Sequence, residues 1–544
     1  MMSSYEAARD SFSWTDAWDK ISTGDKEYLN IGEEALGRHG GSEEIALRLA
    51  DFDTGDTEEY TYAELNEQSN RVANYLKERT EPRARVAAML PASFELYAVI
   101  FGTVKAGRIY VPLSELFSPD ALEYRLADAD TSIFFTNDKH KGKLDTADVD
   151  TLLEAVLIDI DEPTVDQSVT VREFESLTEY GIHFESVKTH PNDTFGIVYS
   201  SGTTGQPKGC KIANNTLLTH YPFCKYVIDL QSEDNYFVTA SPAWSYGLIA
   251  GTFLPGMWGT AIGAYRGKFR PGPFLRMLED FQITNLMAPP TALRQIRDTD
   301  VDVSQYDLSV RILASGGESL DSATVDWYEN KLGVAPLEVY GFTEGAMLAC
   351  NYPFDDWEIK PGSMGRPVPG FDTRIINDEG EQVATDELGE IAVRKTEDTV
   401  FDFTGYWGMP DRTEQKLSGQ WIRSDDLATR DEEGYFWYRS RKDYVIVSAG
   451  YRIGPEEVEE ALMESPYVEE AGVVGVPDEI RGNIVKAYVS VPADIEPTDS
   501  VKSEIQSFTR DRLSKHEYPR EIEFIDAIPK TATGKTKRDA LEDL

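Results

Sequence analysis

The chain has 544 residues, of which 41% are hydrophobic and 11% aromatic, so a disordered or fibrous protein is excluded. Asp and Glu number 96 against 53 Lys and Arg, which gives a formal net charge of −43. Because a surface this negative repels phosphate backbones and anionic lipids, nucleic acid and membranes are poor partners. The acidic residues are spread along the whole chain, a pattern typical of halophilic proteins, whose carboxylates are screened by concentrated salt. An ordinary acidic cytosolic protein is the alternative.

The cysteines and histidines predict neither a disulfide framework nor a structural metal. Cys210, Cys224 and Cys350 show no CxxC spacing, and the six histidines form no zinc pattern, which fits a reducing cytoplasm. No signal peptide is visible at the N-terminus. The uncharged stretch 244–265 contains five glycines and Pro255, so it predicts a buried helix, a turn and a buried strand. A cytoplasmic protein without membrane insertion is expected.

The first third of the chain alternates helix and strand. Thr61 and Glu64 form a capping box that predicts the start of a helix. Short apolar runs predict strands at 84–90, 108–113, 131–136 and 155–160. A longer apolar stretch between the first two predicts a helix at 93–107. Near-continuous apolar strands that alternate with helices indicate an α/β fold with helix-flanked parallel sheets. The polar stretches 138–151 and 161–192 are expected to be surface excursions.

The pattern changes twice in the C-terminal part. Shorter strands at 372–377 and 388–395 predict a β-rich subdomain over about 360–442. From 443 onward the order is strand 443–448, helix 455–464, strands 471–476 and 484–491, a helix over about 500–514 and strand 521–525. These elements predict a large N-terminal domain, 1–442, and a small α+β C-terminal domain, 443–544. Because no low-complexity linker separates them, the boundary is expected to be a tight hinge.

Residues 199–209 read YSSGTTGQPKG and follow a buried apolar strand. Glycines let backbone amides curl around an oxyanion, and the hydroxyls and Lys208 add further donors. The pattern GxxxxGK[ST] is absent from this loop. Gly534, Lys535 and Thr536 do spell GKT, but Pro529 stands where a P-loop needs glycine, so a P-loop ATPase is excluded.

This loop is followed by YGFTEG (340–345), WIRSDDL (421–427), YRSRKDYVIVSAGYRIGPEEVE (438–459) and PKTATGK (529–535). Together these five motifs resemble the adenylate-forming superfamily of acyl-CoA synthetases, peptide-synthetase adenylation domains and firefly luciferase. The resemblance covers roughly 20–544, and the C-terminal half is most similar to the medium-chain acyl-CoA ligases. It implies an ATP-dependent carboxylate–CoA ligase, in which an acyl-adenylate forms with release of pyrophosphate and CoA then displaces AMP. ATP, CoA and Mg²⁺ are the implied cofactors, and a small carboxylic acid is the implied partner; self-association into a homodimer is left open.

The resemblance also implies roles for individual residues in the first half-reaction. Lys535 bridges the acyl carboxylate and the α-phosphate, Thr343 contacts the α-phosphate, and Glu344 holds Mg²⁺. Asp426 takes the ribose hydroxyls with help from Arg441. The full nucleotide-binding set comprises Ser200, Ser201, Gly202, Thr203, Thr204, Gly205, Lys208, Gly317, Glu318, Ser319, Glu338, Tyr340, Gly341, Phe342, Thr343, Asp426, Arg441 and Lys535.

In the second half-reaction the implied hinge is Asp443, about which a mobile C-terminal domain rotates. The rotation withdraws Lys535 and brings Gly450, Tyr451 and Arg452 to the site, where Gly450 lets pantetheine pass close to the backbone. Arg481 and Arg510 are candidates for the CoA phosphates, with surface ion pairing as the alternative.

Trp244, Ser245, Tyr246 and Gly341 are implied to line the acyl pocket, with core packing as the alternative for the two aromatic residues. Gly341 stands where acetate-specific relatives carry tryptophan, so the acid is expected to be larger than propionate and to be medium-chain, branched or aromatic. Two positions depart from the family pattern. The usual TGD is Ser424, Asp425 and Asp426 here, and Gly345 replaces a frequent threonine.

Two other function classes remain open. An adenylation enzyme that loads an acid or amino acid onto a carrier protein would share the first half-reaction. Its amino-acid version needs an acidic pocket residue that residues 242–247 do not offer. A non-catalytic adenylate-binding protein is disfavoured because Lys535, Glu344 and Asp426 occur together.

Overall fold

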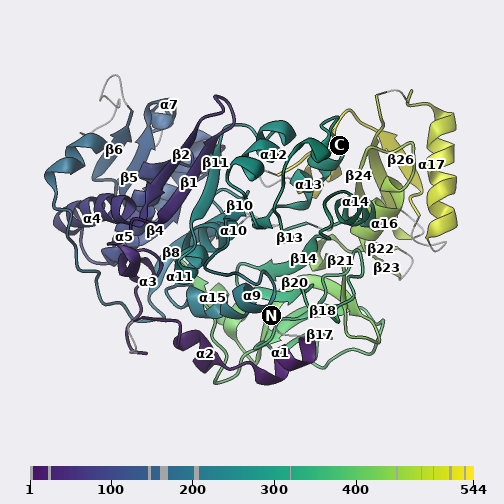
Figure 1. Ribbon diagram of the computed structural model, residues 1–544. Coiled ribbons are helices and arrows are strands. Elements are labelled where there is room, and N and C mark those ends of the chain that lie inside the picture. Colours follow the sequence, from purple (N-terminus) through teal and green to yellow (C-terminus); the bar gives the residue numbers. More distant parts are fainter. Residues whose placement is uncertain are drawn as a thin grey trace. The chain divides into compact units, whose positions relative to one another are not determined.

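The computed structural model describes residues 4–22, 26–144, 149–159, 169–200, 207–318, 320–448, 451–478, 481–493, 495–513, 518–531 and 535–544. The chain forms two compact units (Figure 1). The first comprises Met1–Pro361, Pro367–Asp372 and Val393–Ile422, and the second comprises Gly362–Arg366, Thr373–Ala392 and Arg423–Leu544. Both units combine helices and sheets, which confirms the predicted α/β class with a large N-terminal and a smaller C-terminal part. The predicted boundary after residue 442 lies inside the second unit, and the hinge assigned to it stays a prediction.

The first unit is built on a largely parallel eight-stranded sheet. Its strand order is β19-β9-β8-β4-β3-β5-β6-β7, and only β8/β9 and β9/β19 pair antiparallel. The strands are β3 Arg85–Ala88, β4 Ile109–Pro112, β5 Thr131–Asn137, β6 Glu154–Ile158, β7 Thr170–Glu173, β8 Thr194–Ser200, β9 Lys208–Ala213 and β19 Phe403–Tyr406. Val86, Val111, Phe134 and Ile197 are fully buried in successive strands, which is why these strands read as continuous apolar runs.

A second sheet of this unit runs β10-β12-β13-β14-β15, with the first four strands parallel and β15 antiparallel. These strands are β10 Tyr236–Val238, β12 Asn285–Met287, β13 Ile312–Gly316, β14 Leu337–Phe342 and β15 Ala346–Cys350. A small sheet, β11-β1-β2, joins Ile262–Arg266, Ile45–Asp51 and Thr57–Thr61. Because parallel strands end at the same edge, the segments after β10, β13 and β14 meet there.

Helices pack on these sheets. Helix α4, Tyr62–Arg79, begins at the predicted capping box, in which Thr61 and Glu64 bond each other's backbone, and it packs against α5, Phe94–Lys105. The other helices of the unit are α1 Tyr5–Ser11, α2 Trp14–Trp18, α3 Ile31–Ala35, α6 Pro119–Asp128, α7 Asp138–Lys141, α8 Thr216–Thr219, α9 Tyr221–Tyr226, α10 Ser245–Leu248, α11 Leu254–Trp258, α12 Pro271–Asp280, α13 Pro290–Arg297, α14 Ser322–Leu332 and α15 Pro410–Leu417. Within the described part of the chain, none of them has the length and apolar character that a membrane crossing needs.

The second unit contains two sheets. One has the order β17-β18-β20-β21, from Thr373–Ile376, Gly389–Arg394, Trp421–Arg430 and Phe436–Arg441. The other is ordered β23-β22-β25-β24, with β26 on β25, from Tyr451–Ile453, Ile446–Ser448, Gly482–Ser490, Glu470–Asp478 and Glu521–Phe524. A single 3₁₀ turn, η5 (Lys442–Tyr444), connects β21 to β22. The helices are α16 Pro455–Met463, α17 Asp499–Arg512 and α18 Arg538–Glu542.

One expectation about the elements was wrong. The stretch 161–192 is not only a surface excursion, because β7 pairs with β6 at the edge of the large sheet. A 3₁₀ segment, Phe174–Glu179, follows and buries Phe174 and Leu177 in the core. Only half-buried and exposed residues make up β7, so it carries no apolar run that the sequence could reveal. The uncharged stretch 244–265 folds as predicted, into buried helical turns followed by β11.

Candidate functional site

The flanks of the Gly-rich loop sit at the tip of an antiparallel hairpin. Ser200 ends β8, Lys208 begins β9, and the two residues pair directly. Ser201, Gly202, Thr203, Thr204 and Gly205 lie outside the described residues, so their assigned contacts stay predictions. Behind the loop, Ser200 Oγ lies 3.7 Å from Cys210 Sγ. Burial raises the pKa of the Cys210 thiol, which keeps it protonated and unsuited to act as a nucleophile.

Glu344 is held at the edge of the site by a residue that the sequence did not single out. Tyr406, at the end of β19, donates its hydroxyl to Glu344 Oε1 at 2.7 Å. The Lys208 ammonium lies 5.7 Å from the centre of the Tyr406 ring. One tyrosine thus connects the predicted metal ligand with the lysine of the Gly-rich loop, although the three residues are far apart in sequence.

The donor set around Glu344 fits Mg²⁺ delivered with a nucleotide. A carboxylate that accepts one hydrogen bond keeps lone pairs for a cation, and Mg²⁺ commonly binds one or two carboxylates together with substrate phosphates. No group of three or more His, Cys, Asp or Glu that could hold a metal by itself occurs among the described residues. Glu344 therefore suits a metal that is bound partly by substrate phosphates.

Thr343 and Ser245 meet although about one hundred residues separate them. Ser245 opens α10 after β10, Thr343 follows β14, and their hydroxyl oxygens are 3.5 Å apart. Both follow parallel strands of one sheet, so the topology places them at the same edge. Two residues assigned to different ligands, the acid and the α-phosphate, are thereby adjacent.

The predicted adenine-binding residues lie after β13 and on β14. Gly317 adopts φ +97°, a left-handed conformation that glycine favours. The Glu318 carboxylate accepts from Thr291 Oγ1 at 2.7 and 2.9 Å and from Arg294 Nη2 at 2.8 Å, so its position is fixed. Glu338 is buried and Tyr340 is half-buried on β14. Ser319 lies outside the described residues.

The backbone around Gly341 does not support the expectation that this position opens a volume. A Cβ added at Gly341 would lie 2.4 Å from the carbonyl oxygen of Ala346 and 2.9 Å from Met347 Sδ. The first of these atoms is main chain, so a larger side chain at Gly341 requires β15 to shift. Next to it in sequence, Phe342 has its ring centre 5.6 Å from the Lys416 ammonium, a contact separate from the space at Gly341. The role of Gly341 in the acyl pocket stays a prediction.

The two aromatic residues assigned to the acyl pocket differ in their surroundings. Trp244 is half-buried and packs edge-on against Phe117, with ring centres 5.7 Å apart. The Tyr246 hydroxyl is inaccessible and has no hydrogen-bond partner in the described part of the chain. Burial raises the pKa of Tyr246, so it remains a neutral donor. An inaccessible hydroxyl without a partner is costly, and a bound polar group could satisfy it.

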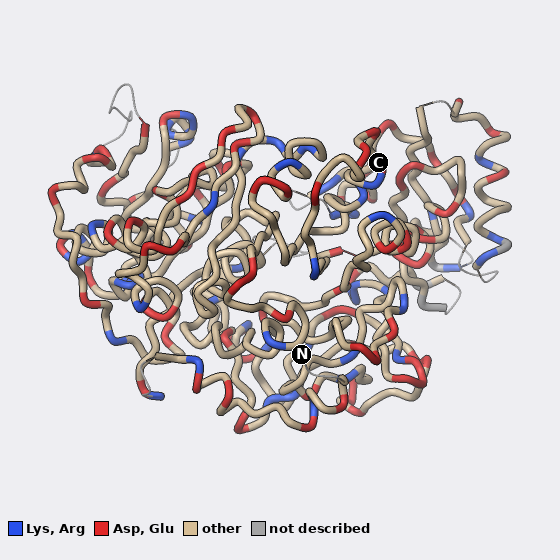
Figure 2. Tube along the Cα trace, in the orientation of Figure 1, with Lys and Arg blue, Asp and Glu red and all other residues tan. Residues whose placement is uncertain are grey.

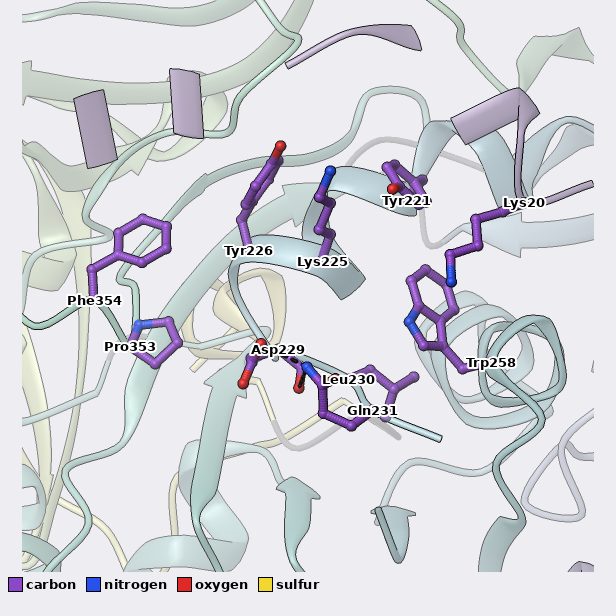
Figure 3. A pocket seen from close by; sticks show the side chains of 10 residues that line it. All are labelled: Lys20, Tyr221, Lys225, Tyr226, Asp229, Leu230, Gln231, Trp258, Pro353 and Phe354. Atoms are coloured by element: carbon purple, nitrogen blue, oxygen red, sulfur yellow. Dashed lines mark hydrogen bonds between the residues drawn. The ribbon is translucent and has the colours of Figure 1, made fainter. Parts of the chain in front are cut away.

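A cavity of about 400 Å³ lies elsewhere in the first unit (Figure 3). Its lining includes Tyr221, Lys225, Asp229, Trp258 and Phe354. Asp229 precedes β10, whereas the predicted acyl residues follow that strand, so the cavity is at the opposite edge of the sheet from Trp244 and Tyr246. It is therefore not the predicted acyl pocket.

The predicted ribose site belongs to the second unit. Asp426 and Arg441 pair across β20 and β21, with Arg441 Nη1 3.8 Å from Asp426 Oδ1. Ser424 Oγ accepts from the Asp426 backbone amide at 3.0 Å, which fixes the turn of the strand. Asp425 adopts φ +66°, the conformation that suits the glycine of the usual TGD. Asp443, the predicted hinge, lies in η5 with Oδ2 3.7 Å from Arg441 Nη2.

Lys535 is exposed on a loop closed by hydrogen bonds with Thr531. The Thr531 amide donates to the Lys535 carbonyl at 2.7 Å, and the Lys535 amide donates to Thr531 Oγ1 at 3.1 Å.

The predicted CoA-binding residues that the structure describes lie on β23, on the turn before β25 and on α17. Gly450 is outside the described residues, and only the backbone of Tyr451 and Arg452, in β23, is described. The Arg481 amide donates to Asp478 Oδ1 at 2.7 Å, and Arg510 is exposed on α17, 3.2 Å from Ser507 Oγ. Nothing in these positions tests the predicted CoA contacts.

Comparison with known proteins agrees with this arrangement. The model of the AMP-binding enzyme family matches residues 34–407, and that of the AMP-binding enzyme C-terminal domain matches 457–535. An acetyl-coenzyme A synthetase of Bacillus subtilis is 34% identical over 99% of this chain and 95% of its own length. A Brucella canis acyl-CoA synthetase structure is 29% identical with a TM-score of 0.77 and covers 99% of this chain and 98% of its own. The structure of the anthranilate CoA ligase AuaEII with anthranoyl-AMP is 26% identical with a TM-score of 0.83 over 96% and 98%. The chain therefore belongs to the AMP-binding enzyme family, the adenylate-forming superfamily that its motifs predicted.

Proposed function

We propose that this AMP-forming acid–thiol ligase works in two steps. A carboxylate attacks the α-phosphate of ATP and releases pyrophosphate, and the thiol of CoA then attacks the acyl carbon and releases AMP. The observation that carries the proposal is the contact of Tyr406 with Glu344, because it joins the predicted metal ligand to the lysine end of the Gly-rich loop. Negative charge accumulates at the α-phosphate in the first step, so cations and fixed donors at that place lower its barrier.

Each part of the candidate site has a role in that step. Lys208 and the Gly-rich loop hold the β- and γ-phosphates, Thr343 contacts the α-phosphate, and Glu344 would hold the Mg²⁺ ion. Asp426 accepts both ribose hydroxyls, because one carboxylate can accept two donors, and Arg441 keeps it oriented. The Lys535 ammonium contacts the α-phosphate during adenylate formation and is withdrawn from the site before thiolysis. The metal would polarise the phosphate oxygens.

The acid is proposed to be medium-chain, branched or aromatic. Support comes from Trp244, which is only half-buried and so leaves part of its ring accessible to an apolar acid, whereas the partnerless Tyr246 hydroxyl, two residues further along, suits a polar substituent on the acid. The related anthranilate CoA ligase is named for an aromatic acid, whereas the Bacillus subtilis relative is named for acetate, so both classes belong in the test. The alternative function, loading of a carrier protein, shares the adenylate and differs only in the thiol acceptor.

A panel of acids separates these outcomes. Acetate, butanoate, hexanoate, decanoate, isobutyrate and benzoate are each incubated with ATP, Mg²⁺ and CoA in molar potassium chloride, and AMP and thioester are measured. We expect the highest rates with acids larger than propionate, whether medium-chain, branched or aromatic. Formation of AMP without acyl-CoA, together with transfer to an added carrier protein, would favour the alternative function. Preference for acetate would overturn the proposed acid class but not the reaction.

The Lys535→Ala variant tests the two-step scheme. We expect it to lose about 10²–10³ in the rate of acyl-adenylate formation, because one positioned donor of a developing charge is removed. Thioester formation from supplied hexanoyl-adenylate should be little changed, since the lysine is not needed after pyrophosphate has left. Pyrophosphate exchange and thioester release measure the two half-reactions separately.

Lys537→Ala is the matched control for this variant. Lys537 is exposed two residues further along, and its backbone amide donates to the Pro529 carbonyl at 2.8 Å, a bond that the substitution retains. It should keep both half-reactions at the wild-type rate. Equal loss of both half-reactions in a folded Lys535→Ala protein would contradict the scheme.

A further inference from the structure

A cluster of charged side chains in the second unit has no part in the predicted site. Arg538, the first residue of α18, is 7% exposed, and its Nη2 lies 2.7 Å from Glu459 Oε2 and 3.0 Å from Glu456 Oε1. Both glutamates are on α16. One guanidinium nitrogen therefore joins the beginning of the C-terminal helix to the first helix after the predicted hinge.

The cluster contains two carboxylates and one guanidinium. Glu459 is well satisfied, because its Oε1 also accepts the Val473 amide at 2.8 Å. Glu456 Oε2 and Arg538 Nε are inaccessible and have no hydrogen-bond partner among the described residues. Two charged carboxylates that contact the same guanidinium nitrogen repel each other, so one of the two retains a proton. Glu456 has fewer hydrogen bonds than Glu459 and is therefore the carboxyl that retains it.

The surroundings of Glu456 favour its neutral form. The pKa of Glu456 is raised to about 8, chiefly by burial and in part by the charges of Glu459 and Asp426, while Arg538 acts in the opposite direction. Asp426 reaches it from β20, and Tyr438 faces the cluster from β21. Burial raises the pKa of Glu459 as well, but Arg538 and the Val473 amide oppose that shift, so we place the proton that the pair shares at neutral pH on Glu456, which leaves the cluster without net charge.

The same arginine closes the loop that carries Lys535. Lys530 and Thr536 form a bridge, and the Lys537 amide donates to the Pro529 carbonyl at 2.8 Å, so the residues on either side of the segment 532–534 pair with each other. Arg538 follows at once as the buried end of this loop. Its guanidinium carbon lies 5.2 Å from the centre of the Tyr444 ring, in the η5 turn that contains Asp443.

We propose that Arg538 is a positioning residue for Lys535, and that it fixes the Lys535 loop to α16 and to the η5 turn only while Glu456 retains its proton. This inference rests on the proposed role of Lys535 in acyl-adenylate formation. Loss of the proton leaves a second buried carboxylate charge on one guanidinium, and the loop anchor loosens. Lys535 itself does not need to titrate.

The sign of the pH effect follows from the raised pKa. A group that binds its proton more tightly in the folded protein contributes stability that is complete below its ordinary pKa, which is 4.5 for Glu456. That contribution is lost as the pH rises through about 8. The melting temperature and the rate of adenylate formation should therefore fall together between pH 7 and pH 9. Thiolysis of a supplied adenylate does not need Lys535. Its rate should therefore show no fall between pH 7 and pH 9, and any change should reflect only the ionisation of the CoA thiol to the reactive thiolate.

The test compares four variants with the wild type, using hexanoate, butanoate or benzoate, whichever the panel shows to react. Arg538→Met should slow adenylate formation at least tenfold and leave thiolysis of the matching adenylate within twofold, and Arg538→Lys should recover part of the loss. Glu456→Gln, which mimics the protonated acid, should remove the alkaline fall in adenylate formation. The matched control is Arg512→Met, which breaks an exposed ion pair between the end of α17 and Glu464, the residue after α16, with Arg512 Nε 2.7 Å from Glu464 Oε2, and which should change neither half-reaction.

The outcomes separate this inference from the proposed function. If the wild type forms no acyl-adenylate from any acid of the panel, the proposed function itself fails, and if it does so but Lys535→Ala retains adenylate formation, only the proposed role of Lys535 fails. If Lys535→Ala loses it but Arg538→Met keeps the wild-type rate, or loses both half-reactions equally while folded, the positioning role is overturned. If Arg538→Met does not fold, the pH profile of Glu456→Gln decides, and an alkaline fall as steep as in the wild type overturns the role of the proton.

Discussion

Asp425 occupies a backbone conformation that costs an L-amino acid free energy. Its φ of +66° is in the left-handed region, where glycine has no Cβ to collide and aspartate is tolerated. The Asp425 amide donates to Glu390 Oε1 at 3.1 Å, which holds the residue in place next to Asp426. We expect Asp425→Gly to raise the free energy of unfolding by about 0.5–1 kcal/mol, because the strain is removed and the amide bond is kept. Chemical unfolding in molar salt measures this change.

Asp386→Gly is the control for that substitution. Asp386 also has a left-handed φ, +62°, and its amide donates to the Arg430 carbonyl at 2.9 Å, but it is exposed and outside the predicted ribose site. Both variants should gain similar stability if backbone strain is the cause. A loss of stability in Asp425→Gly alone would mean that contacts of its side chain outweigh the strain.

At this scale the sequence predicted some neighbours and missed others. Asp426 and Arg441 belong to motifs separated by one hairpin, so their pairing across β20 and β21 agrees with what the motifs implied. Tyr406 and Glu344 are 62 residues apart, and the sequence carries no local sign that β19 places its last residue beside the end of β14. The Arg538 cluster also joins residues that are distant in sequence. It could not be predicted because charged residues on helices usually face solvent.

At the scale of elements, α11 packs closely on α3. A Cβ at Gly256 would lie 1.9 Å from the Ala35 carbonyl oxygen, and hydrogen bonds from Arg38 to Met257 and between His39 and Gly256 hold the two segments together. We expect Gly256→Ala to destabilise the protein by about 1–3 kcal/mol, because the clash is with main chain that cannot rotate away. Thermal unfolding in molar salt measures the loss.

Gly272→Ala is the matched control, because it also follows a proline at the start of a helix. The nearest atom to its added Cβ is Val301 Cγ2 at 4.0 Å, so no clash arises. The better helix propensity of alanine should leave stability unchanged or raise it by up to about 1 kcal/mol. A similar loss in both variants would mean that helix starts in general, and not the contact with α3, cause the effect.

Elements were predictable where burial leaves a pattern in the sequence. The strands β3, β4, β5 and β6 are buried on both faces, and each falls within about two residues of its predicted bounds. The edge strand β7 has no buried residue, so neither an apolar run nor an alternation could reveal it. How the β-rich strands divide between two compact units was also not predictable, because it depends on contacts distant in sequence.

At the scale of the whole molecule, the net charge of −43 sets the conditions for stability. Asp and Glu occur along the entire trace, in both units, rather than in one tail (Figure 2). Screening acts within about 3 Å at 1 M salt but only beyond about 30 Å at 0.01 M, so carboxylates repel one another over the whole protein in dilute buffer. The charges lie closer together in the folded protein than in the unfolded chain, so their repulsion destabilises the folded state.

We therefore expect the melting temperature to fall, and adenylate formation to be lost, when the protein is dialysed from 3 M potassium chloride into dilute buffer. Sucrose is the control, because it favours the compact state by exclusion but screens no charge. If sucrose in dilute buffer fully restored the melting temperature, the stabilising effect of salt would come from its exclusion from the protein surface and not from the screening of charge. A melting temperature that does not change with salt would contradict the halophilic interpretation, because self-repulsion of this size would then be compensated within the fold. Lowering the pH toward 5 in dilute buffer gives an independent check, since partial protonation of carboxylates reduces the repulsion and should raise the melting temperature without added salt.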